Sequence, residues 1–126
     1  RKVSESLQNV TVINQGYEKV LSKAKAGDFI YLDPPYHPVS ETASFTSYTT
    51  DGFSGQNQVE LRDAFLELHK RGCLVMLSNS DTDFINSIFG EIASEGIIIN
   101  KVSAGRAINS NSAKRGKVKE VLVTNY

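Results

Sequence analysis

Residues that could do chemistry are concentrated in one quartet, Asp33-Pro34-Pro35-Tyr36. It follows Phe29–Leu32, a short and bulky run that predicts a strand buried on both faces. Proline lacks the amide donor that a sheet needs and disfavours helical backbone in the residue before it, so the strand must end at the quartet. A carboxylate, free carbonyl oxygens and an aromatic ring then lie at the carboxyl end of a strand, where open α/β sheets bind ligands. This combination suits a planar ligand that carries an amino group.

A strand that ends in an Asp-Pro turn is common in proteins without any function attached to it. The second proline makes the quartet more specific, because it fixes a further φ angle and removes a further donor. The quartet therefore predicts a rigid site rather than an ordinary turn.

The elements that must position this quartet alternate between strand and helix, a pattern typical of an α/β fold with a parallel sheet. Strands are expected at Val10–Ile13, Phe29–Leu32, Cys73–Leu77, Ile97–Val102 and Val121–Val123. Helices are expected around Val20, Leu21 and Ala24 with an end at Gly27, from a cap at Ser54 to Gly72, and from a cap at Ser80 or Asp81 to Gly90. A polar loop at 37–53 is long enough to indicate a functional segment.

Length and composition limit the number of domains and the classes of protein to which the chain can belong. A chain of 126 residues predicts one domain or part of one, and its formal net charge of zero gives no overall sign of a nucleic-acid partner. Cys73 is the only cysteine, so we expect neither an internal disulfide nor a metal cluster, as suits a reducing cytoplasm. No apolar run is long enough for a membrane span, and we expect no membrane association. The start at Arg1 without a methionine predicts a fragment or a processed chain.

The quartet resembles the catalytic motif of the amino methyltransferases of DNA, and its Asp form resembles the adenine-N6 enzymes. Three further segments resemble the Dam-like adenine methyltransferases: Phe45-Thr46-Ser47-Tyr48, the Ser78-Asn79 pair after a strand, and the stretch from Arg106 to Asn111. The glycine-rich turn with which that family grips much of its cofactor has no match here. The chain therefore resembles the part of the family that follows its target-recognition insert.

This resemblance implies a Rossmann-like methyltransferase sheet, mostly parallel with an antiparallel C-terminal hairpin, and incomplete in this chain. Residues 1–126 would be the C-terminal part of the catalytic domain, without the N-terminal cofactor half and the insert. The implied activity is transfer of a methyl group from S-adenosylmethionine to the N6 amino group of an adenine flipped out of double-stranded DNA.

The resemblance also assigns roles to residues. Asp33, Pro34, Pro35 and Tyr36 are the catalytic candidates, and Asp33 is the one candidate for cofactor binding. Phe45, Tyr48 and Asn79 are candidates for the base and its loop, although aromatic residues can equally anchor a loop to the protein body. Arg106, Lys114, Arg115 and Lys117 are candidates for DNA phosphate, because the stretch 101–119 has six basic residues and no acid.

Two other functions stay open. A hydrophobic strand that ends in Asp also occurs in P-loop nucleotide hydrolases, although this chain lacks G-x-x-x-x-G-K-[ST]. A DNA-binding module without activity is the second alternative. By the resemblance, the strand with Asp33 has an unpaired edge here, so we also expect self-association or association with the N-terminal half.

Overall fold

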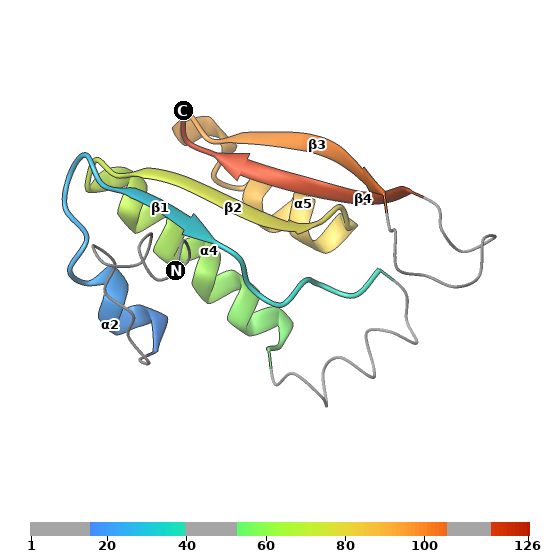
Figure 1. The fold of residues 1–126 in the computed structure, drawn as a ribbon, viewed down its shortest axis with the longest axis horizontal. Helices are drawn as coiled ribbons and strands as arrows, with labels where there is room; N and C mark the ends of the chain where they lie inside the picture. Colours follow the sequence, from blue (N-terminus) through green and yellow to red (C-terminus); the bar gives the residue numbers. More distant parts are fainter. Residues whose placement is uncertain (1–15, 40–52, 106–116) are drawn as a thin grey trace, which may run out of the picture.

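The computed structural model describes residues 16–39, 53–105 and 117–126, which form a four-stranded sheet with helices packed against it (Figure 1). The strands are β1 (Phe29–Leu32), β2 (Leu74–Ser80), β3 (Ile98–Gly105) and β4 (Lys117–Thr124). The helices are α2 (Tyr17–Leu21), α4 (Gly55–Lys70), α5 (Asp83–Gly90) and a short 3-10 helix, η1 (Ala93–Glu95). None of the described helices is both long and apolar enough to cross a membrane.

The sheet has the order β1-β2-β4-β3 and is mixed. β1 and β2 are parallel, with Leu32 opposite Leu77, whereas β4 runs antiparallel to both β2 and β3. The antiparallel C-terminal hairpin is confirmed, but only one pair of the described strands is parallel. The parallel pair matters most for function, because it brings the residues that follow β1 and the last residues of β2 to the same end of the sheet.

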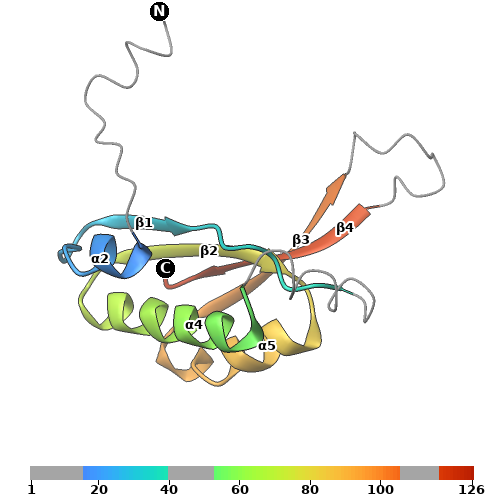
Figure 2. The ribbon, with the colours of Figure 1, turned by 90° about the horizontal axis from the view of Figure 1, so that it is seen from below.

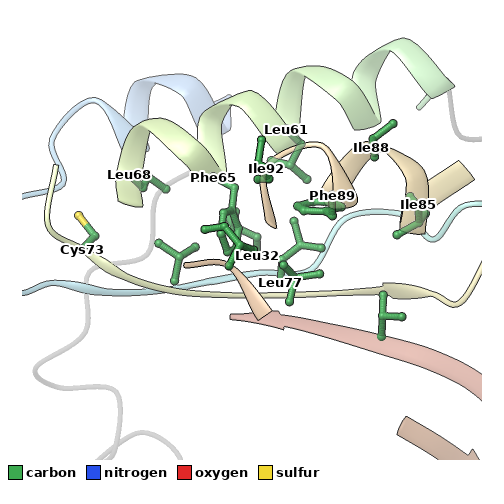
Figure 3. Packing of buried hydrophobic residues seen from close by; sticks show 14 residues of the cluster. Leu32, Leu61, Phe65, Leu68, Cys73, Leu77, Ile85, Ile88, Phe89 and Ile92 are labelled. Atoms are coloured by element: carbon green, nitrogen blue, oxygen red, sulfur yellow. The ribbon is translucent and has the colours of Figure 1, made fainter. Parts of the chain in front are cut away.

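α4 and α5 cover one face of the sheet and enclose the core (Figure 2). Alternate residues of the central strands, Val75 and Leu77 in β2 and Val121 and Val123 in β4, are fully buried. Phe65 of α4 and Phe89 of α5 meet edge to face with ring centroids 5.8 Å apart (Figure 3). This packed core holds the central strands in place and thereby fixes the positions of the residues at the strand ends.

No described helix covers the opposite face, which we call the open face. Phe29 and Tyr31 of β1 are 56% and 52% exposed there, and Leu74 of β2 and Ile98 of β3 are exposed to a lesser extent. The prediction that Phe29–Leu32 is buried on both faces is therefore wrong for this chain. β1 pairs with β2 alone among the described strands, so its side chains alternate between the core and solvent.

The ends of the two long helices follow local capping chemistry. Ser54 caps α4 as expected, in a reciprocal capping box with Asn57, and Gly72 follows the helix with a φ of 94°. α5 is capped by Thr82, whose hydroxyl accepts from the amide of Ile85, and not by Ser80 or Asp81. The expected cap is wrong because β2 continues through Ser80 instead of ending at Leu77.

The remaining differences from the predicted structure concern the lengths of the helices and strands. α2 ends at Leu21 and not at Gly27, which instead adopts a φ of 92° in the turn leading to β1. The C-terminal hairpin is longer than expected, since β3 reaches Gly105 and β4 begins at Lys117. The strand expected at Val10–Ile13 lies outside the described residues.

Candidate active site at the ends of β1 and β2

Asp33 lies exposed at the end of β1, and the end of β2 holds its carboxylate. The hydroxyl of Ser78 donates a hydrogen bond to Asp33 Oδ1 at 3.0 Å. Ser78 Oγ also lies 2.9 Å from the hydroxyl of Tyr31. The carboxylate is thus open to a ligand while one of its oxygens is fixed by the sheet.

Buried amide side chains anchor the turn from the core side at Pro35 and His37. Gln58 of α4 donates from Nε2 to the carbonyl oxygen of Pro35 at 2.9 Å. Its Oε1 accepts from Asn79 Nδ2 at 2.9 Å, and Asn79 Oδ1 accepts from the backbone amide of His37 at 2.9 Å. Gln58 and Asn79 are 3% and 0% exposed, so these bonds are shielded from water. Buried and mutually satisfied amides of this kind fix one backbone conformation.

Tyr36 reaches toward the C-terminal hairpin. Its hydroxyl donates to Glu120 Oε2 at 3.4 Å, a long hydrogen bond. Burial raises the pKa of Tyr36; the Ser78 hydroxyl opposes this, whereas the Glu120 and Asp33 carboxylates add to it. The phenol is therefore neutral at physiological pH, and its ring is only partly buried.

His37 closes the far end of the turn. Its ring stacks on Phe84 of α5 with centroids 4.8 Å apart, and its Nδ1 lies 3.1 Å from the Thr82 hydroxyl. The hydroxyl of Ser80 donates to the carbonyl oxygen of His37. Burial lowers the pKa of His37, which favours the neutral imidazole. These contacts give His37 a structural role in the turn.

A pocket of about 190 Å³ opens beside the quartet. Its lining is mostly apolar and comes from Tyr17, Leu32, Asp33, Pro34, Pro35, Phe53 and Leu61. Two aromatic rings and one carboxylate are suitable partners for a flat, polar-edged ring. A second and larger hollow of about 390 Å³ lies between α2 and α4 and does not include Asp33.

The structure brings part of the expected site together. Asp33, Pro34, Pro35 and Tyr36 form the exposed turn, and Asn79 lies beneath it, where it shapes the turn and cannot touch a ligand directly. Phe45, Tyr48, Arg106, Lys114 and Arg115 lie outside the described residues, as does the side chain of Lys117 at the start of β4.

Lys101, which belongs to the basic stretch, makes contacts within the protein. Its ammonium lies 2.7 Å from Asp81 Oδ1 and 2.6 Å from Asn86 Oδ1. This lysine is therefore a weaker candidate for a phosphate contact than the charge run alone indicates.

Several residues of the site were not predicted from the sequence: Phe53, Gln58, Ser78 as the hydrogen-bond donor to Asp33, and Glu120 as the partner of Tyr36. One signal was available for Gln58, since it lies three residues before Leu61 on the inner stripe of α4, where a polar residue is unusual. Phe53 carries no such signal, because it reaches the pocket only through the tertiary fold.

Fold and site together define a class: an α/β protein with an Asp-Pro-Pro-Tyr turn at the carboxyl end of a strand, as in methyltransferases that act on amino groups. Residues 1–104 match the family of D12 class N6 adenine-specific DNA methyltransferases. The chain belongs to this family.

Curated relatives agree with the family match. The chain is 43% identical to the type II methyltransferase M1.LlaDCHI of Lactococcus lactis subsp. cremoris, over 98% of this chain and 43% of that protein. It is 40% identical to the type II methyltransferase M.MjaIII of Methanocaldococcus jannaschii, over 100% of this chain and 43% of that protein. It is 38% identical to a DNA adenine methylase of Vibrio cholerae serotype O1, over 94% of this chain and 42% of that protein. The chain thus spans less than half the length of these relatives.

Proposed function

We propose that residues 1–126 are the C-terminal part of a methyltransferase catalytic domain that methylates the N6 amino group of an adenine flipped out of double-stranded DNA. The observation that carries the proposal is the Asp33 turn, held by Ser78 and by Gln58 beside a pocket with two aromatic rings. In the complete domain we expect further strands on the β1 side, which would make the sheet mostly parallel and Rossmann-like. We place this activity in the cytoplasm.

The chemistry follows from the hydrogen-bonding capacity of the turn. The lone pair of an adenine amino nitrogen is delocalised into the ring, which makes the nitrogen a poor nucleophile. If Asp33 and the carbonyl oxygen of Pro34 accept its two hydrogens, the nitrogen becomes pyramidal and the lone pair localises. Bonds to a carboxylate are about twice as strong as neutral ones, and a fixed geometry lowers the barrier further.

Tyr36 would hold the flipped base. Tyr36 follows Asp33 by three residues in the same turn and is partly exposed, so its ring can stack on a planar heterocycle. Stacking of a base on an aromatic side chain contributes about 1–3 kcal/mol.

The residues that line the pocket beside the quartet fit one part of S-adenosylmethionine. A pocket of about 190 Å³ is smaller than the range of about 300–1,000 Å³ typical of small-molecule sites, so these residues form only one wall of a cofactor site. Asp33 would bind a positively charged part of the cofactor or orient the base against it. When bound, S-adenosylmethionine supplies an electrophilic methyl group.

Replacement of Asp33 tests the catalytic role. Asp33→Ala in the full-length enzyme should lower the methyl-transfer rate by at least about a hundredfold, as removal of one key polar group does in other enzymes. Because Asp33 is exposed, the circular dichroism spectrum and the unfolding midpoint should stay close to those of the parent enzyme. Near-normal turnover of Asp33→Ala would show that this site is not the catalytic one.

We further propose that the basic stretch contacts DNA phosphates. Each contact contributes about −0.9 to the slope of log affinity against log salt concentration. Replacing Lys114, Arg115 and Lys117 together by alanine should flatten that slope, measured by fluorescence anisotropy with a labelled duplex. Lys101→Ala is the matched control, since Asp81 already pairs with this lysine. An unchanged slope in the triple variant would exclude phosphate contact by these residues.

The two alternatives are not favoured by the family match. A labelled-cofactor transfer assay separates an active methyltransferase from a DNA-binding module, and magnesium-dependent phosphate release would point to a nucleotide hydrolase.

A further inference from the structure

Tyr31, Asp33 and Ser78 lie on the open face of the sheet, and the geometry of the strands explains why they meet. Tyr31 and Asp33 are two residues apart along β1 and its extension, so their side chains leave the same face. Tyr31 pairs directly with Met76 of β2, and Ser78 is two residues further along that strand. The tyrosine side chain is long enough to reach this diagonal neighbour, and its hydroxyl lies 2.9 Å from Ser78 Oγ.

The direction of the hydrogen bonds follows from the number of protons. The Ser78 hydroxyl has one proton and donates it to Asp33 Oδ1 at 3.0 Å. The 2.9 Å contact between Ser78 Oγ and the Tyr31 hydroxyl must therefore have Tyr31 as the donor. The result is a directed chain that begins at the Tyr31 hydroxyl, passes through the Ser78 hydroxyl and ends on the Asp33 carboxylate.

We propose that Tyr31 and Ser78 are positioning residues that orient the Asp33 carboxylate toward the amino group of the substrate base. Ser78 is suited to this role because it is 2% exposed and lies within the strand, which fixes its position. Asp33 is exposed, and its carboxylate would rotate freely without such an anchor. With Oδ1 held by Ser78, the other oxygen remains available to the ligand. The proposal rests on the methyltransferase function proposed above.

A structural role for the same bonds makes a different prediction. If they only stabilise the turn, their loss should lower the free energy of unfolding and leave the turnover of folded enzyme unchanged. If they position Asp33, their loss should lower kcat while the KM values for DNA and cofactor change little.

The test uses Ser78→Ala, Ser78→Thr, Tyr31→Phe and the Ser78→Ala/Tyr31→Phe double variant in the full-length enzyme. A hydrogen bond to a charged group predicts a loss of kcat on the order of ten- to hundredfold for Ser78→Ala, and the neutral bond predicts about two- to tenfold for Tyr31→Phe. Ser78→Thr keeps the hydroxyl and should restore most of the rate. The double variant should be no slower than Ser78→Ala, because Tyr31 acts only through Ser78.

Two controls match these changes. Tyr126→Phe removes a hydroxyl from a tyrosine that is 53% exposed and packs against Phe29 on the same face, and Ser87→Ala alters an exposed serine of α5. Both should retain the parent kcat. The four Ser78 and Tyr31 variants are also compared in urea unfolding. Losses in the free energy of unfolding that are not additive between Ser78→Ala and Tyr31→Phe would show that the two hydrogen bonds are coupled, independently of activity.

The outcomes separate this proposal from the proposed function. Parent enzyme that transfers methyl groups while Ser78→Ala and Tyr31→Phe keep its kcat would overturn the positioning role and leave the function intact. Additive losses of kcat in the double variant would overturn the chain from Tyr31 through Ser78. Parent enzyme without methyl transfer would overturn both proposals, whatever the unfolding data show.

Discussion

Among single side chains, Tyr36 separates the contribution of an aromatic ring from that of its hydroxyl. The hydrogen bond from this hydroxyl to Glu120 is long, at 3.4 Å, so Tyr36→Phe should keep kcat/KM within about threefold of the parent, as expected for a weak hydrogen bond. Tyr36→Ala removes the stacking surface and should cost about 1–3 kcal/mol, or roughly five- to 150-fold in kcat/KM. Steady-state methylation of a short duplex measures both variants. Equal losses in both would assign the role to the hydroxyl bond with Glu120.

The chemical groups of the site could be predicted from the sequence, but their supports could not. Asp33 and Tyr36 belong to one local motif in which the prolines dictate a turn, so adjacent residues suffice to place them. Gln58, Ser78 and Glu120 lie 23, 45 and 84 positions from their partners Pro35, Asp33 and Tyr36. Contacts over such distances depend on strand register and helix docking, which local sequence patterns do not encode.

Among the secondary-structure elements, α4 carries the clearest local determinant of stability. The Ser54 hydroxyl accepts from the Asn57 amide at 3.3 Å, and the Asn57 side chain accepts from the Ser54 amide at 2.8 Å. Ser54→Ala should lower the free energy of unfolding by about 1 kcal/mol, because it leaves amides of the first helical turn without a partner. Urea denaturation of the full-length enzyme measures the change. Ser87→Ala at an exposed position of α5 is the control, and its free energy of unfolding should stay within about 0.5 kcal/mol of the parent.

Helix caps and apolar stripes could be predicted well, whereas the lengths and exposure of strands could not. Ser54 and the stripe through Leu61, Phe65 and Leu68 are local patterns, and the structure confirms them. β2 extends through three polar residues, Ser78 to Ser80, because β4 lies opposite them and satisfies their backbone groups. The exposure of Phe29 and Tyr31 depends on which elements cover the open face, and that is not a property of β1 alone.

In the molecule as a whole, the open face and the free edge of β1 predict association. Phe29, Tyr31 and Leu74 present apolar surface, and the outer edge of β1 has no partner among the described strands. Such an edge pairs readily with another strand. We expect the 126-residue chain to self-associate or to bind the remaining part of the enzyme, with weak or undetectable binding of S-adenosylmethionine alone.

Light scattering and calorimetry test this expectation. Phe29→Lys places a charge on the open face at the β1 edge and should shift the isolated chain toward monomer, whereas Ser87→Lys at an exposed position of α5 should not. Micromolar binding of the cofactor by a monomer would mean that the cofactor site is complete within these residues.

The central position of β4 has a consequence for biosynthesis. β4 forms its hydrogen bonds with β2 on one side and β3 on the other, although it is the last of the four strands to be translated. While residues 117–124 are still inside the ribosome, the edges of β2 and β3 that pair with β4 in the folded protein have no partner. Closure of the sheet therefore waits for β4, and the exposed edges of β2 and β3 should attract chaperones until β4 inserts.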